Sequence, residues 1–141
     1  MAGLLAFISV ESMNFAIALL AGPQDPAARS ALQFARAVLD SGHHISRLFF
    51  YRDAVLIASH LGVQPQDESD ISSEWRHFIR DNQLDAVVCI AAALRRGVLD
   101  EAEANRWNRP SANTTAPWVL SGLGQWVDAL QSADRAVTFG T

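Results

Sequence analysis

The chain has 141 residues, of which half are hydrophobic and 18% are charged, so it has the composition of a folded domain and not of a disordered segment. Eleven basic and fifteen acidic residues leave a net charge of −4, which argues against a broad surface that follows nucleic-acid phosphates, although it allows a small basic patch. The single cysteine, Cys89, cannot form an internal disulfide or a multi-cysteine zinc site.

The start of the chain carries an apolar run, residues 3–10, that resembles a targeting signal only superficially. No basic residue precedes this run, and it is much shorter than the ~20 residues of a membrane span. We therefore interpret residues 1–12 as an N-terminal extension and residues 13–141 as one domain. With no other candidate span in the sequence, we expect the protein in the cytoplasm.

Short apolar runs then alternate with segments of helical periodicity. In chain order, the sequence predicts a buried strand at 14–20, a helix capped by Asp25 and ended by Gly42, a strand at 44–50 and a short helix at 53–61. A polar loop at 62–69 leads to a helix with Trp75, Phe78 and Ile79 on its inner face, and then to a strand at 84–90. A helix capped by Asp100 and ended near Trp107, a strand at 118–120, a turn at 121–124, a helix at 125–131 and a strand at 135–139 complete the chain. Five strands with intervening helices predict a three-layer α/β/α sandwich with a mainly parallel sheet.

Cys89 is the first candidate functional residue, because it lies near the carboxyl end of the third predicted strand, where sites gather in open parallel sheets. If the chain turns into a helix there, unpaired backbone N–H groups would favour the thiolate. Arg95 and Arg96 follow closely enough to add positive potential. The alternative is a cysteine that only packs in the core, as most free cysteines do. The reactive interpretation requires a sulfur atom that lies open at the edge of the domain.

Other candidates carry weaker signals. The segment Ser121-Gly122-Leu123-Gly124 could cradle an anion, but it lacks the third glycine of a dinucleotide fingerprint, so a tight turn is the simpler interpretation. Asp100 and Glu103 have the spacing of a capping box rather than of a catalytic carboxylate pair. Four histidines share no metal-ligand spacing: His43, His44, His60 and His77.

Three segments, taken in this order, resemble the TusD/DsrE family of sulfur-relay proteins: Phe49-Phe50-Tyr51-Arg52-Asp53, the segment 88–98 (VCIAAALRRGV) and Ser121-Gly122-Leu123-Gly124. The resemblance covers Met13 to about Gly140, with Ala54 in place of a glycine usual in the family. It implies a flavodoxin-like fold and a sulfurtransferase in which Cys89 carries sulfane sulfur as a persulfide. It also implies that neither a metal nor an organic cofactor takes part.

The resemblance further implies partners. Members assemble with homologous subunits, TusB and TusC or DsrF and DsrH, into a heterohexamer, and exchange sulfur with a TusA-like donor and a TusE-like or DsrC-like acceptor. No direct contact with nucleic acid or membrane is implied. We expect Arg95, Arg96 and Ser121 to stabilise anionic forms of the sulfur or to help dock an acidic carrier.

Three functional alternatives remain open at this point. TusD-like members act in the 2-thiolation of the tRNA wobble uridine, whereas DsrE-like members serve dissimilatory sulfur oxidation. A noncatalytic assembly subunit could share the fold. The presence of Cys89 favours a catalytic role, since such subunits can lack the cysteine.

Overall fold

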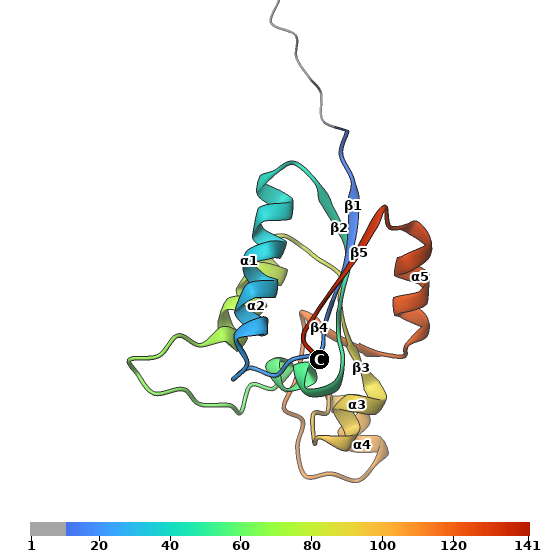
Figure 1. Cartoon of the computed structure of the whole chain (residues 1–141). Helices are drawn as coiled ribbons and strands as arrows, with labels where there is room; N and C mark the ends of the chain where they lie inside the picture. The colour runs from blue at the N-terminus through green and yellow to red at the C-terminus, as the bar shows by residue number, and fades with distance from the viewer. Residues whose placement is uncertain (1–10) are drawn as a thin grey trace, which may run out of the picture.

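The computed structural model describes residues 11–141 and contains a five-stranded sheet in which every neighbouring pair of strands is parallel (Figure 1). The strands are β1 (Asn14–Leu19), β2 (His44–Phe50), β3 (Ala86–Cys89), β4 (Trp118–Ser121) and β5 (Arg135–Phe139), in the spatial order β4-β3-β2-β1-β5. This sheet confirms the predicted α/β class. Most of the predicted N-terminal extension, residues 1–10, lies outside the described residues.

Helices cover both faces of this sheet. Helices α1 (Pro26–Asp40) and α2 (Ile71–Asp81) lie on one face, and α5 (Gly124–Ser132) lies on the other (Figure 1). The chain steps in one direction from β1 to β4 and then returns across the sheet to β5, so right-handed crossovers place the returning helix on the opposite face. Three short segments lie at the carboxyl ends of the strands: the 3-10 helix η1 (Arg52–Ala58), α3 (Ile90–Arg95) and α4 (Glu101–Arg106).

Aromatic side chains fill the layer between the sheet and α2. The ring of Phe50 lies edge-on to Trp75 and to Trp118, with centroid distances of 5.2 and 4.9 Å. The indole N–H of Trp75 donates to the carbonyl oxygen of Ala28 at 3.1 Å, which links α2 to α1. On the opposite face Phe49 packs against Trp126 of α5, with centroids 5.8 Å apart. Adjacent residues of β2 thus anchor opposite layers, as the alternation of a strand requires.

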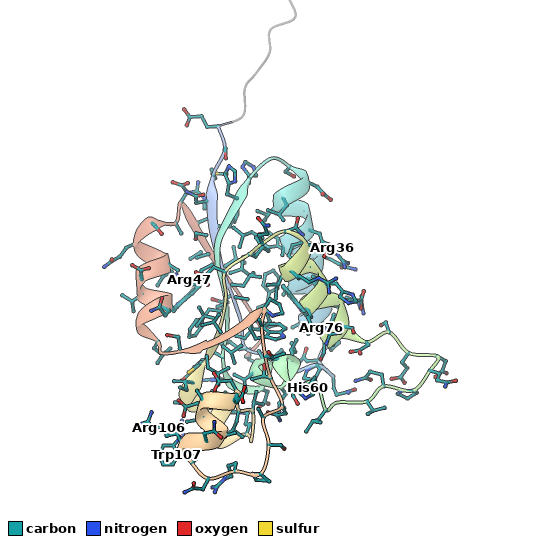
Figure 2. All side chains as sticks on the ribbon, turned by 180° about the vertical axis from the view of Figure 1, so that it is seen from behind. Arg36, Arg47, His60, Arg76, Arg106 and Trp107 are labelled. Atoms are coloured by element: carbon teal, nitrogen blue, oxygen red, sulfur yellow. The ribbon has the colours of Figure 1, made fainter. Side chains whose placement is uncertain are left out.

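Arg47 fastens α5 to the sheet (Figure 2). Its guanidinium donates to the carbonyl oxygen of Gln125 at 2.8 Å and forms ion pairs with Asp85 at 2.7 Å and Asp128 at 3.1 Å. Burial lowers the pKa of Arg47, but the two carboxylates outweigh burial and leave that pKa raised. The cation therefore stays charged while it joins β2, the approach to β3 and α5.

Several element boundaries differ from the sequence prediction by one to three residues, and two of these differences lie at the carboxyl edge of the sheet. The third strand ends at Cys89 and not at 90, because Ile90 is already the first residue of α3. The short helix after β2 is a 3-10 helix over 52–58. A continuous apolar run such as 86–90 has no periodicity that separates a strand from the helix that follows it. Within residues 11–141, no helix combines the length and the apolarity that crossing a membrane requires.

Candidate functional site

The candidate site is built around Cys89 at the carboxyl edge of the sheet. Cys89 is the last residue of β3 and the N-cap residue of α3, and Ser121 at the end of β4 is its register partner. It points to the same face of the sheet as Val87, which is the register partner of Phe49 and therefore faces the α5 layer. The structure thus brings two of the predicted site residues, Cys89 and Ser121, together from segments far apart in the sequence.

The expectation of an exposed Cys89 thiol is wrong, because Cys89 is only 2% exposed. Strand β3 lies inside the sheet with β2 on one side and β4 on the other, so neighbouring strands flank the cysteine. The helix that follows packs two buried alanines, Ala92 and Ala93, against the core. A reagent or partner therefore reaches the sulfur atom only if part of the structure around the end of β3 moves.

Arg96 ties α3 to η1. Its Nε atom donates to Oδ1 of Asp53 at 3.0 Å, and Nη1 donates to the carbonyl oxygen of Ala92 at 3.1 Å. Asp53 belongs to the sequence motif 49–53, but no sequence pattern indicated that Asp53 would bind Arg96. The guanidinium predicted to stabilise an anion is thus already engaged with a carboxylate that holds two loops of the carboxyl edge together.

Arg95 behaves differently from its neighbour. It is exposed and forms no ion pair with any residue in the described part of the chain. It lines a small cavity of about 360 Å³ together with Leu94, Gly97, Leu99, Trp107 and Arg109. The sequence indicated Arg95 as a site residue, but it marked Trp107 only as the end of a helix. Exposure of a single tryptophan leaves no signal in a local sequence pattern.

The turn between β4 and α5 adds no side-chain cap. Leu123 is the N-cap residue of α5 and accepts no hydrogen bond through its side chain. A Cβ atom added at Gly122 or at Gly124 would contact nothing within 4 Å. These glycines leave the start of α5 uncovered beside Ser121. They also agree with the tight-turn interpretation of this segment.

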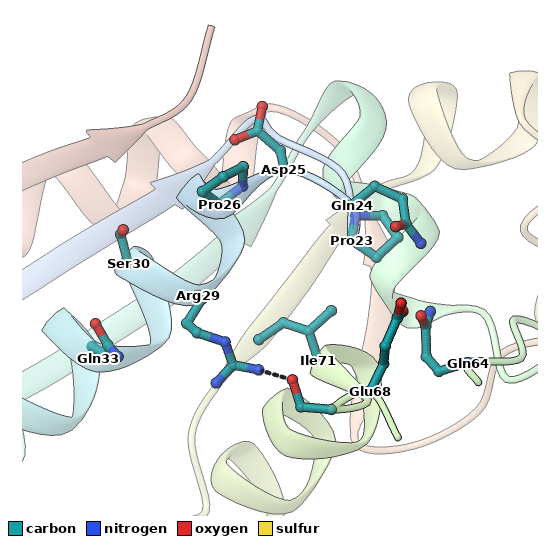
Figure 3. Close-up of a pocket in the computed structure, with 11 residues that line it drawn as sticks. Pro23, Gln24, Asp25, Pro26, Arg29, Ser30, Gln33, Gln64, Glu68 and Ile71 are labelled. Carbon is teal, nitrogen blue, oxygen red and sulfur yellow. Dashed lines mark hydrogen bonds between the residues drawn. The ribbon is translucent and has the colours of Figure 1, made fainter. Parts of the chain in front are cut away.

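A larger cavity of about 600 Å³ lies between α1 and the loop before α2 (Figure 3). Arg29 crosses this cavity, where it donates to the hydroxyl of Ser69 at 2.7 Å and forms an ion pair with Glu74 at 2.6 Å. The hydrogen bond from Arg29 holds the pKa of Glu74 below its usual range, against the raising effect of burial. The pKa of Arg29 is raised through the same hydrogen bond. Cys89 does not line this cavity, and Arg29 of α1 joins that helix to the loop at Ser69 and to α2 at Glu74, so we assign Arg29 and Glu74 a structural role outside the site.

Residues 11–141 contain no group of three histidine, cysteine, aspartate or glutamate side chains arranged to hold a metal. One histidine has an evident structural role, because Nδ1 of His43 accepts a hydrogen bond from the backbone N–H of Met13 at 3.0 Å. Another cavity, of about 630 Å³, is lined by His60, Asp100, Glu101 and the buried Thr114. Cys89 does not line it either.

Comparisons with known proteins agree on one family. The model of the DsrE/DsrF-like family matches residues 13–139. The chain is 60% identical to the sulfurtransferase TusD homolog of Pseudomonas aeruginosa over 128 residues, which cover 91% of this chain and 98% of that protein. It is 46% identical to the putative sulfurtransferase DsrE of Allochromatium vinosum over 129 residues, which cover 91% and 99%. It is also 46% identical to the sulfurtransferase TusD of Serratia proteamaculans over 112 residues, which cover 79% and 87%.

A solved structure supports the fold independently. The crystal structure of the ychN protein from Escherichia coli superposes with a TM-score of 0.69 and covers 92% of this chain and 100% of that chain. The two sequences are 18% identical, so this likeness concerns the fold alone.

Proposed function

We propose, from the premise that this chain belongs to the DsrE/DsrF-like family and is a sulfurtransferase, that Cys89 carries the transferred sulfur as a persulfide. The observation that carries the proposal is the position of Cys89. The only cysteine of the chain stands at the carboxyl end of an interior strand, between Ser121 and the start of α3. Ligand and reaction sites of open parallel sheets gather at that edge.

The transfer consists of two exchanges that balance without an external oxidant or reductant. The Cys89 thiolate attacks the outer sulfur of a donor persulfide; the Sγ–S bond forms while the S–S bond of the donor breaks, and the donor leaves as a thiolate. An acceptor thiolate then attacks the outer sulfur on Cys89, and Cys89 leaves as a thiolate. The thiolate is the nucleophile in both steps, so the protein has to hold Cys89 where it can ionise and be reached.

Within this scheme Arg96 is a positioning residue. Its contacts with Asp53 and with the carbonyl oxygen of Ala92 fix α3, whose first residue follows Cys89 directly. Ser121 lies opposite Cys89 in the sheet register and forms the other wall of the proposed site. Because Cys89 is buried, we expect each exchange to require a displacement of α3 or of the turn after Ser121.

The branch of sulfur metabolism that we favour is the 2-thiolation of the tRNA wobble uridine. Identity to a TusD homolog, 60%, exceeds identity to a DsrE protein, 46%, which supports a TusD-like role over one in dissimilatory sulfur oxidation. The family implies sulfur-relay partners in general. The specific partners that we propose are a TusA-like donor and a TusE-like acceptor. A free thiol persists in a reducing compartment, so we expect this reaction in the cytoplasm.

An exposed apolar stripe supports assembly with homologous subunits. The stripe combines one residue of the edge strand β4 with residues at the start of α5 and along it: Val119, Leu123, Val127 and Leu130. Helix α5 covers its face of the sheet, whereas the opposite face has two helices. We propose that TusB-like and TusC-like subunits use this stripe in a heterohexamer. Burial of four large apolar side chains at one surface is typical of an interface core.

The second candidate function is a noncatalytic assembly subunit, and the burial of Cys89 is the observation that favours it. The two candidates differ in what intact-mass analysis detects after incubation with a cysteine desulfurase, cysteine and a TusA-like carrier. Sulfur transfer predicts that the wild-type chain gains a sulfur atom that a reductant removes, and that Cys89→Ser gains none. Equal labelling of the two proteins, or no labelling of the wild type within its assembled complex, would leave the assembly role as the function.

A further inference from the structure

The small cavity beside α3 has the character of a peptide-binding groove. We call it the arginine groove and define it by its lining residues: Leu94, Arg95, Gly97, Leu99, Trp107 and Arg109. Two half-buried leucines, Leu94 and Leu99, supply its apolar part. The groove lies at the end of the molecule where α3 and α4 meet, next to Arg106 and Trp107 (Figure 2).

Trp107 is both exposed and fixed by a side-chain hydrogen bond. Its side chain is 50% exposed, although the indole N–H is already satisfied by Oε2 of Glu103 at 2.9 Å. The guanidinium of Arg106 lies 5.3 Å from the ring centroid. Because the indole N–H is already bonded, the part of Trp107 that a partner can contact is its apolar ring. Tryptophan and arginine are the residue types that most often dominate protein interfaces.

Two arginines that line the groove, Arg95 and Arg109, form no ion pair with the described residues. Within residues 11–141, the guanidinium of Arg109 donates only to the backbone oxygen of Trp107, at 3.2 Å. The neighbouring carboxylate of Glu103 accepts the hydrogen bond from the Trp107 indole and lies 3.8 Å from the guanidinium of Arg106. The chain as a whole has a net charge of −4, so two arginines without ion pairs beside one cavity differ from its overall charge balance.

We propose that the arginine groove docks an acidic segment of a partner protein and that an apolar side chain of that segment packs against Trp107. Charge complementarity selects an acidic occupant, and the leucines and the indole select one that carries an apolar residue. The identity of the partner rests on the proposed function: we expect a sulfur-carrier protein. Helix α3 (Ile90–Arg95) begins directly after Cys89 and ends at the rim of the groove, about 9 Å further on at ~1.5 Å per residue, so a docked segment contacts the far end of the helix that follows the thiol.

The test uses fluorescence anisotropy with a short labelled peptide of aspartate and glutamate residues around a central leucine. We expect binding to the wild-type chain that weakens with added salt and that weakens about tenfold or more in Arg95→Glu and in Arg109→Glu. The matched control is Arg80→Glu, a charge reversal at an exposed arginine of α2 outside the groove. It should bind as the wild type does. Circular dichroism of each variant confirms that the fold is retained.

Absence of binding would overturn the docking proposal, and so would equal weakening of binding by Arg80→Glu. Equal binding of a control peptide with asparagine and glutamine in place of the acidic residues would also overturn it. Displacement of the labelled peptide by tRNA at a lower concentration than by unlabelled peptide would overturn it in favour of a nucleic-acid site. Self-association of the chain that Arg95→Glu abolishes would assign the groove to a second copy instead. Cys89→Ser separates the two proposals. A Cys89→Ser chain that binds the peptide while the wild type fails to form a persulfide refutes sulfur transfer alone, and persulfide formation without peptide binding refutes docking alone.

Discussion

We expect the link between Arg96 and Asp53 to limit access to Cys89, and thiol labelling tests this directly because Cys89 is the only cysteine in the sequence. We expect Arg96→Met to speed the reaction of Cys89 with Ellman's reagent in the folded protein. Methionine keeps an unbranched apolar side chain but removes both guanidinium contacts, to Asp53 Oδ1 at 3.0 Å and to the carbonyl oxygen of Ala92 at 3.1 Å. Helix α3 then separates from η1 more often.

The size of the effect follows from the exposure of the ion pair. The side chains of Arg96 and Asp53 are 30% and 67% exposed, so solvent screens the pair and its loss costs about 0.5–1 kcal/mol. A difference of 1.4 kcal/mol is a factor of ten in an equilibrium constant, so the population with α3 displaced rises about two- to fivefold. When labelling is slow relative to closing, the labelling rate rises by the same factor.

Arg95→Met is the matched control, since it makes the same change one residue earlier at a side chain without an ion pair. The rate in urea gives the reference for a fully open thiol. Labelling of the native wild type at the urea rate would refute the burial of Cys89. Equal acceleration by Arg95→Met and Arg96→Met would refute the control of access by the Asp53 contact.

Three further predictions concern stability and assembly. Trp75→Phe should lower the free energy of unfolding in urea by about 2 kcal/mol, because it removes the indole hydrogen bond to Ala28 and leaves unfilled volume in the core. Glu74→Gln should lower the free energy of unfolding at neutral pH by less than about 1 kcal/mol, since Arg29 and Glu74 are 37% and 31% exposed and solvent screens their ion pair. Folding lowers the pKa of Glu74 in the wild type, so the Glu74 carboxylate stabilises the fold at pH values above its unfolded pKa. This stabilisation is lost as pH falls through the folded pKa. The melting temperatures of Glu74→Gln and the wild type should therefore converge at acid pH. The chain expressed alone should self-associate in light scattering, and Val127→Asp should reduce this without lowering the melting temperature, because Val127 is exposed.

Each of these predictions has a clear contrary result. Trp107→Phe, at an exposed indole, should cost less than Trp75→Phe; the reverse order would contradict the assigned core. A constant gap between Glu74→Gln and the wild type from neutral to acid pH would show that the Arg29 bond is not the cause. A chain that stays monomeric at high concentration and ignores added partner subunits would rule out the apolar stripe as an interface.

Local features of the sequence were enough to predict most of the elements. The first helix carries its own boundaries, because the side chain of Asp25 accepts the N–H of Ala27 at 2.8 Å and Gly42 adopts a φ of 82° just beyond the end. Buried strands are marked by apolar runs, and their alternation with helices predicts a parallel sheet. Such signals depend on residues within a few positions of one another, so they can be recognised in the printed chain.

The surroundings of Cys89 depend on contacts of another kind. Asp53 and Arg96 are 43 residues apart, and they meet because η1 and α3 follow adjacent parallel strands to the same edge of the sheet. The burial of the thiol likewise depends on how strands and helices pack around the end of β3, which has a neighbouring strand on each side. The order of the strands and the packing of the helices determine which side chains lie close together and which of them are buried. Hydrophobic periodicity and helix caps contain no information about that order, so the cysteine could be identified from the chain while its accessibility came only from the packed fold.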